Sequence, residues 1–145
     1  MMKTIVSAID FSDVSEKVLA QSQELAAATG AKLYVVHVVE QLAAFYDIYG
    51  YTVPDIEGFE AHARERAETS LKEKASVVNL PADKMETVVL EGPIQETLLN
   101  FMDTQQADLL VVGSHGHGLV ARVLLGSTAQ RILNKCEVPV LVVPA

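Results

Sequence analysis

Residues 32–39 read KLYVVHVV, and this segment is the strongest indication of the fold in the sequence. After Lys32 its apolar run is interrupted only by His37. A strand buried on one face alternates apolar and polar residues, whereas a strand covered by helices on both faces is apolar almost throughout. The segment therefore predicts an internal strand of a parallel sheet. Within it, His37 is expected to be a core histidine that has a hydrogen-bond partner.

On either side of this segment, apolar runs alternate with stretches of helical period. The expected strands are residues 5–9, 32–39, 86–90, 108–112 and 138–143. The expected helices run from Asp13 to about Gly30, from Phe59 to Val78, from Gly92-Pro93 onward and from Ser127 to Lys135, with a long loop over residues 40–57. Asp13 and Glu16 have the spacing of a capping box, and Gly30 suits a helix C-terminus. This order predicts a three-layer α/β/α sandwich with a mainly parallel sheet.

The composition favours a single domain over residues 1–145. Half of the residues are hydrophobic and 21% are charged, which allows a well-filled core. The formal net charge of −8 argues against binding to nucleic acid or anionic lipid, and no apolar run reaches the roughly 20 residues of a membrane span. Cys136 is the only cysteine, so there is no disulfide framework and a reducing cytoplasm is the expected compartment.

An acidic residue follows the first expected strand, and a cluster of glycines follows the fourth. Asp10 comes after residues 5–9, and Gly113 comes after residues 108–112. In open α/β sheets, ligands bind beyond the carboxyl ends of the strands, where the strand order reverses. If the order is flavodoxin-like, these two strands are neighbours at the reversal, and Asp10 and the Gly113 loop share one crevice.

The loop after Gly113 has the spacing of a phosphate site. Gly116 follows after two residues, and Gly126-Ser127-Thr128 follows after nine more, at the start of the last expected helix. Glycines let a backbone approach a ligand closely, and a helix start offers free N–H groups to an anion. The loop matches neither the P-loop nor the G-x-G-x-x-G pattern. From spacing alone, a glycine-rich surface turn remains an alternative.

Taken together, these segments resemble the universal stress protein (UspA-like) family, and in particular its ATP-binding branch with the G-2x-G-9x-G-[ST] motif. The resemblance is carried by IVSAIDFS at 5–12, GAKLYVVHVV at 30–39, EGP at 91–93, and VVGSHGHG, LLGSTAQRIL and PVLVVP between residues 111 and 144. It implies a sheet of order 3-2-1-4-5, of the flavodoxin-like or adenine nucleotide alpha hydrolase-like type. It also implies ATP as the ligand. Mg²⁺ is expected to bridge the phosphate oxygens and to be held mostly by water rather than by protein ligands.

The resemblance also implies a role for each matching position. The implied contacts are adenosine for Ala8, Ile9 and Asp10, adenine for Val38, the ribose and adenine side for Val112 and Gly113, and phosphates for Gly116, Gly126, Ser127 and Thr128. Some ATP-binding relatives carry proline where Ala8 stands. The family further implies a homodimer through the last strand, and Val138 to Val143 is the kind of apolar edge that pairs if uncovered.

Several residues keep a plainer interpretation. Asp10 suits a helix cap as well as a ligand contact, although Ser12 and Asp13 could cap instead. His115 and His117 make a poor metal site, because no cysteines or carboxylates are nearby. Arg122 is equally suited to binding a phosphate and to an ordinary position at the surface. Cys136 is expected to be structural. The tyrosines at 46, 49 and 51 suit a cover over the site, a partner surface or an ordinary loop.

The residue features and the family resemblance together predict a cytoplasmic module that binds ATP. The homodimer, the regulatory role in the stress response and the unidentified protein partner are what the resemblance implies. The sequence has no P-loop lysine and no evident general base, and this argues against efficient catalysis. The alternative is a slow Mg-dependent ATPase, or an enzyme that phosphorylates itself on Ser127 or Thr128. A flavodoxin-like or electron-transfer-flavoprotein-like module is a third, weaker interpretation.

Overall fold

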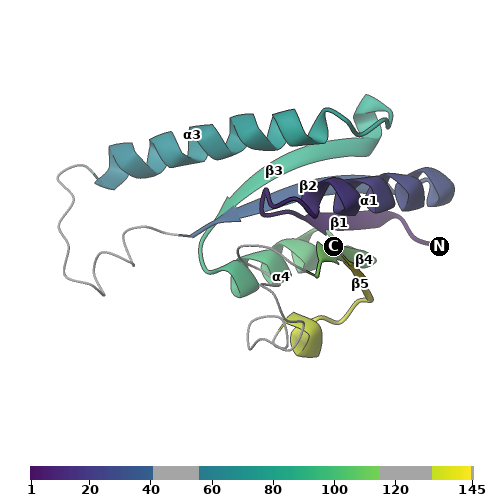
Figure 1. The fold of residues 1–145 in the computed structure, drawn as a ribbon. Coiled ribbons are helices and arrows are strands. Elements are labelled where there is room, and N and C mark those ends of the chain that lie inside the picture. Colours follow the sequence, from purple (N-terminus) through teal and green to yellow (C-terminus); the bar gives the residue numbers. More distant parts are fainter. Residues whose placement is uncertain (41–55, 115–131, 145) are drawn as a thin grey trace.

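The centre of the molecule is a sheet of five parallel strands in the order β3-β2-β1-β4-β5 (Figure 1). This computed structural model describes residues 1–40, 56–114 and 132–144. The strands are β1 (Thr4–Ala8), β2 (Lys32–Val39), β3 (Met85–Glu91), β4 (Leu109–Gly113) and β5 (Val140–Val143). The expected strand order and parallel sheet are confirmed, and every pairing between these strands is parallel.

Helices cover both faces of the sheet (Figure 1). The helical elements are α1 (Ser15–Thr29), α3 (Ile56–Ala75), the short 3₁₀ turn η1 (Ala82–Lys84), α4 (Ile94–Thr104) and a helical segment over residues 132–135. Helices α1 and α3 lie on one face, and α4 lies on the other. None of the helices in the described part of the chain is long and apolar enough to cross a membrane.

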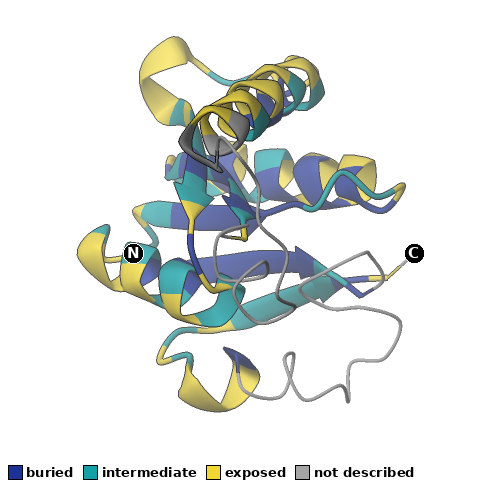
Figure 2. Ribbon diagram, turned by 90° about the vertical axis from the view of Figure 1, so that its left-hand side faces the viewer, coloured by how far each residue is buried: buried dark blue, intermediate teal, exposed yellow. Residues whose placement is uncertain are grey.

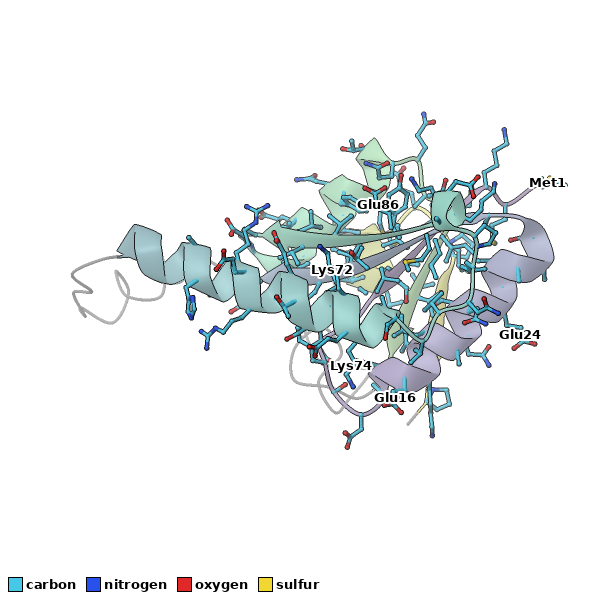
Figure 3. The ribbon with its side chains drawn as sticks, turned by 90° about the horizontal axis from the view of Figure 1, so that it is seen from above. Met1, Glu16, Glu24, Lys72, Lys74 and Glu86 are labelled. Atoms are coloured by element: carbon cyan, nitrogen blue, oxygen red, sulfur yellow. The ribbon has the colours of Figure 1, made fainter. Side chains whose placement is uncertain are left out.

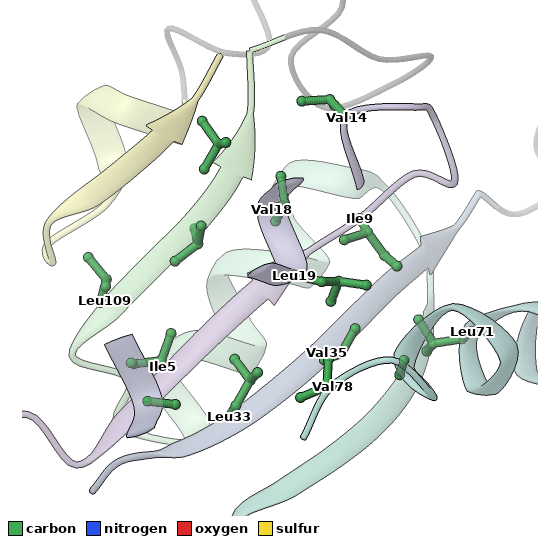
Figure 4. Close-up of a cluster of buried hydrophobic side chains, with 14 of the residues drawn as sticks. Ile5, Ile9, Val14, Val18, Leu19, Leu33, Val35, Leu71, Val78 and Leu109 are labelled. Atoms are coloured by element: carbon green, nitrogen blue, oxygen red, sulfur yellow. The ribbon is translucent and has the colours of Figure 1, made fainter. Parts of the chain in front are cut away.

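Two apolar clusters hold these layers together. The first joins α1 and α3 to the sheet and includes Ile5, Leu19, Leu33 and Leu71 (Figure 4). The second joins α4 to the opposite face. Because side chains alternate along a strand, neighbouring residues of β1 enter different clusters. Buried residues are therefore concentrated on the inner strands β1, β2 and β4, whereas the edge strands β3 and β5 are mostly half-buried. The outer surfaces of the helices are exposed (Figure 2).

The two helices on the first face are also joined by polar contacts. Lys74 on α3 and Glu16 at the start of α1 form an ion pair at 3.8 Å, and their side chains lie close together in Figure 3. In the segment that follows α3, the backbone N–H of Asn79 donates to Oε1 of Gln23 on α1 at 2.8 Å. The ion pair is exposed, so it contributes little, and apolar contact dominates this packing.

The start of β1 is fixed by a residue that the sequence patterns did not single out. The Asp108 carboxylate accepts the backbone N–H of Lys3 at 2.8 Å and that of Thr4 at 3.0 Å. These two hydrogen bonds lower the pKa of the Asp108 carboxyl below its usual value. The carboxylate thus ties the first residues of β1 to the residue that precedes β4.

Three local expectations differ from the structure. The second helix, expected from Phe59 to Val78 after a loop over residues 40–57, runs from Ile56 to Ala75. Helix α1 begins at Ser15, and its cap position is occupied by Val14 without a side-chain hydrogen bond, so the capping box of Asp13 and Glu16 is not formed. Strand β5 begins at Val140 rather than at residue 138. Proline has no N–H to donate, and Pro139 joins β4 only through its carbonyl, which accepts the Leu110 N–H at 3.0 Å.

Other local expectations are confirmed. Gly30 ends α1 in the left-handed conformation, with φ of 74°, and donates its N–H to Ala26. The buried stripe of the second helix includes Ala67, Leu71 and Ala75.

Candidate functional site

The site predicted from the sequence lies where β1 and β4 end. These strands are parallel neighbours, with Ser7 opposite Val111. Asp10 and Gly113 therefore reach the same edge of the sheet, as expected. The chain builds the sheet outward from β1 to β3 in one direction and from β4 to β5 in the other. The ends of β1 and β4 are thus the point where the strand order reverses, which is where ligands bind in such sheets.

Three of the predicted site residues share one face of the sheet. Ala8, Val38 and Val112 belong to the cluster on the α4 face and are 5%, 7% and 4% exposed. Their side chains form an apolar layer beneath this edge. Ile9 belongs to the cluster on the other face and is 2% exposed. The structure thus groups the first three residues and points the Ile9 side chain away from them.

Asp10 organises the turn that follows β1. Its Oδ1 accepts the backbone N–H of Ser12 at 3.0 Å, the pattern in which aspartate mimics a backbone turn. The Ser12 carbonyl in turn accepts the N–H of Ser15, the first residue of α1. Asp10 therefore shapes the entry to the helix without capping it, and the half-buried carboxylate stays at the end of the sheet.

The backbone of Val38 lies beyond the last paired residues of β1 and β2. The final bond of this ladder runs from the Ile9 N–H to the Val36 carbonyl at 2.9 Å. Alternate residues of a strand direct their backbone groups to the same neighbour, so Val38 faces the same side as Val36. On the other side, the Val39 carbonyl accepts the Gly92 N–H. The N–H and C=O of Val38 are thus directed past the end of β1, toward the predicted site.

His37 contacts the turn from the opposite face of the sheet. Its Nδ1 lies 2.8 Å from the carbonyl oxygen of Ile9. The imidazole also stacks on the Phe11 ring, with centroids 4.2 Å apart and planes inclined by 33°. The expected hydrogen-bond partner is confirmed, although His37 is half-buried rather than in the core. The sequence patterns did not connect this residue with the site, because nothing in them indicates a contact between residues 9 and 37.

The predicted phosphate residues Gly116, Gly126, Ser127 and Thr128 lie outside the described residues. So do His115, His117, Arg122 and the tyrosines at 46, 49 and 51. Their roles stay predictions from the sequence. Within residues 1–40, 56–114 and 132–144, no three His, Cys, Asp or Glu side chains are grouped as metal ligands.

A separate cavity of about 360 Å³ lies at the other end of the sheet. Its lining includes Met102, Ala107, Cys136 and Val138, which are near the starts of β4 and β5. Asp10 and Gly113 lie at the ends of their strands, so the cavity is not part of the predicted site. Cys136 is half-buried there.

Comparison with known proteins identifies the family. The model of the universal stress protein family matches residues 1–144. A universal stress protein A homolog of Coxiella burnetii is 33% identical over 141 residues, which cover 97% of this chain and 95% of the relative. A universal stress protein of Thermus aquaticus is 33% identical over 147 residues, 99% of each chain.

Comparison with solved structures supports the same family. A universal stress protein solved in complex with cAMP is 25% identical, with a TM-score of 0.62 over 98% of this chain and 96% of that one. The sequence motifs, the strand order and the match of the family model over nearly the whole chain lead to one conclusion: this chain belongs to the universal stress protein family.

Proposed function

We propose that this chain binds ATP at the carboxyl ends of β1 and β4 and acts as a nucleotide-dependent regulatory module. The observation that carries the proposal is that Asp10 and Gly113 follow neighbouring strands at the same edge of the sheet, where the strand order reverses. Asp10 places a carboxylate where ribose hydroxyls can donate to it. Gly113 begins the segment whose glycine spacing predicts the phosphate seat.

In this arrangement the protein offers the adenine ring both an apolar surface and a polar edge. Ala8, Val38 and Val112 provide the apolar layer on the α4 face. The Val38 N–H and C=O point past β1 and offer one donor and one acceptor, which suits the edge of adenine. The relative solved with cAMP supports an adenine nucleotide as the class of ligand.

The part of the proposed site that would bind the phosphates is inferred from the sequence. Gly116, Gly126, Ser127 and Thr128 would hold the phosphates through backbone N–H groups and hydroxyls at a helix start. Mg²⁺ would be bound by phosphate oxygens and water, since such sites commonly take few protein ligands. A local seat of this kind can bind an anion even though the chain carries a formal net charge of −8.

We also propose a cytoplasmic homodimer formed through β5. This strand is at the edge of the sheet. The carbonyls of Pro139 and Val143 accept N–H groups from β4 and the residue after it, so the peptide groups of Val140 and Val142 face outward. Pairing with a second copy would satisfy them and cover the apolar edge. Such a dimer could present a nucleotide-dependent surface to a protein partner.

The proposed ligand can be tested by native mass spectrometry of freshly purified protein, followed by denaturation to release bound small molecules. An adenine nucleotide, one per chain at most, is the expected finding. A flavin in its place would contradict the proposal and favour the flavodoxin-like interpretation.

A further inference from the structure

The three residues that follow β1 carry the carboxylate on which the proposed site depends. Ile9, Asp10 and Phe11 lie beyond the last strand residue, Ala8. A carboxylate that must meet a ribose needs a fixed backbone, because small displacements of a binding group weaken its hydrogen bonds. The residue that contacts this segment on both sides of Asp10 is His37 of β2.

The first contact fixes the peptide group that precedes Asp10. His37 Nδ1 lies 2.8 Å from the Ile9 carbonyl oxygen, which belongs to the peptide bond between Ile9 and Asp10. A carbonyl can only accept, so Nδ1 must carry the proton and donate it. The Ile9 N–H is bonded to the Val36 carbonyl. Both ends of residue 9 are therefore tied to β2.

The second contact fixes the residue that follows Asp10. Phe11 has φ of 65°, a conformation that residues with a Cβ atom seldom adopt. Its ring lies against the same imidazole, with centroids 4.2 Å apart. Phe11 also packs against the apolar cluster on the α1 and α3 face. The stacking helps to offset the unfavourable backbone conformation and holds the turn closed.

Both contacts lie on the face opposite the proposed adenine surface and flank Asp10. Along β2, Leu33 and Val35 enter the cluster on the α1 face, whereas Val36 and Val38 enter the cluster on the α4 face. His37 follows Leu33 and Val35 in this alternation. It therefore lies behind the turn rather than among the residues that would meet adenine.

We propose that His37 is a positioning residue that sets the place of the Asp10 carboxylate for the nucleoside, an inference that rests on the proposed function. One imidazole holds the peptide before Asp10 through a hydrogen bond and the residue after it through ring stacking. His37 acts on ligand affinity through Asp10 and does not touch the nucleotide.

The test is calorimetric titration of nucleotide-free protein with ATP and Mg²⁺. His37→Leu keeps apolar bulk but removes the donor, and it should weaken ATP binding about five- to ten-fold, the effect of losing a well-placed hydrogen bond. His37→Asn retains an N–H donor near the position of Nδ1 and should recover part of this loss. The matched control is His62→Leu on the exposed surface of α3, which should leave affinity unchanged.

A double-mutant cycle with Asp10→Asn separates positioning from a general structural role. If His37 acts through Asp10, His37→Leu should change affinity less than about two-fold in the Asp10→Asn background. Circular dichroism checks that each variant is folded. If His37→Leu does not fold, Phe11→Leu takes its place, because it removes the stacking and leaves the hydrogen bond.

The outcomes distinguish this inference from the proposed function. If wild-type protein binds ATP and His37→Leu binds it equally well, the positioning role is overturned while the proposed function stands. An equal loss in both Asp10 backgrounds overturns it as well, and so does the absence of any recovery with His37→Asn. If wild-type protein binds no adenine nucleotide, the proposed function fails and the role of His37 fails with it.

Discussion

Asp10 accepts the backbone N–H of Ser12 through Oδ1 at 3.0 Å, so its carboxylate both shapes the turn after β1 and lies at the proposed site. Asparagine keeps an oxygen that can accept this N–H, and it is equally suited to such turns. Asp10→Asn should therefore preserve the fold and remove only the negative charge. We expect ATP affinity to fall about ten-fold or more, because hydrogen bonds to a charged group are the stronger ones.

Calorimetry measures this effect, and thermal unfolding checks that the turn is retained. Asp13→Asn is the matched control, since Asp13 is an exposed aspartate in the same connection. Equal affinity of Asp10→Asn and wild type would remove Asp10 from the binding site.

Gly92, which joins β3 to α4, should tolerate no side chain. Its φ is 136°, and an added Cβ would lie 2.5 Å from Oγ1 of Thr97. We expect Gly92→Ala to cost about 2–3 kcal/mol in the free energy of unfolding, from backbone strain and steric conflict together.

Gly30→Ala provides the comparison, because Gly30 also has positive φ but an added Cβ there would meet no atom within 4 Å. It should cost only about 1 kcal/mol. Urea denaturation measures both values, and adding Thr97→Ala to Gly92→Ala should recover part of the larger loss. Equal losses for the two glycines would contradict the steric explanation.

Asp108 should make stability depend on pH. The N–H groups of Lys3 and Thr4 lower the pKa of its carboxyl in the folded state. Its contribution is therefore present above the ordinary aspartate pKa of about 4 and is lost as the pH falls through the lowered value. Asp108→Asn should lose about 0.5–1 kcal/mol at pH 7, a small amount because the group is close to solvent.

The difference in the free energy of unfolding between wild type and Asp108→Asn should shrink as the pH falls below the pKa of the Asp108 carboxyl in the folded state. Both side chains are neutral there. Urea unfolding at a series of pH values measures it, with the exposed Asp83→Asn as control. A difference that stays constant across the series would show that the charge of Asp108 contributes nothing.

The proposed dimer predicts a specific effect of Val142→Pro. The Val142 N–H faces away from β4, so proline there removes a bond to the partner strand and spares the ladder within the chain. Wild type should sediment as a dimer and Val142→Pro as a folded monomer, while Val142→Thr, which keeps the N–H, should remain a dimer. A wild-type monomer at high concentration would reject pairing through β5.

Long apolar runs made the sheet predictable from the sequence. The strands fall within about one residue of the expected bounds, except for β5, where Pro139 shortens the ladder. The topology in turn placed Asp10 and Gly113 at the same edge of the sheet, because parallel neighbouring strands have their carboxyl ends at one edge.

Contacts between distant polar groups were not predictable. Asp108 binds N–H groups more than a hundred positions away, and His37 binds a carbonyl 28 positions away. The capping box failed for a related reason, since Asp10 and the left-handed Phe11 set the approach to α1. Patterns of local spacing carry no information on which backbone groups a fold leaves within reach.

The most direct test of ATP binding is titration of nucleotide-stripped wild-type protein with ATP and Mg²⁺ by calorimetry. We predict saturable ATP binding at one site per chain, with a Kd in the micromolar to submillimolar range. Binding should also raise the melting temperature, because the ligand stabilises only the folded chain. The absence of both binding heat and a thermal shift at millimolar ATP would contradict the proposed ATP binding.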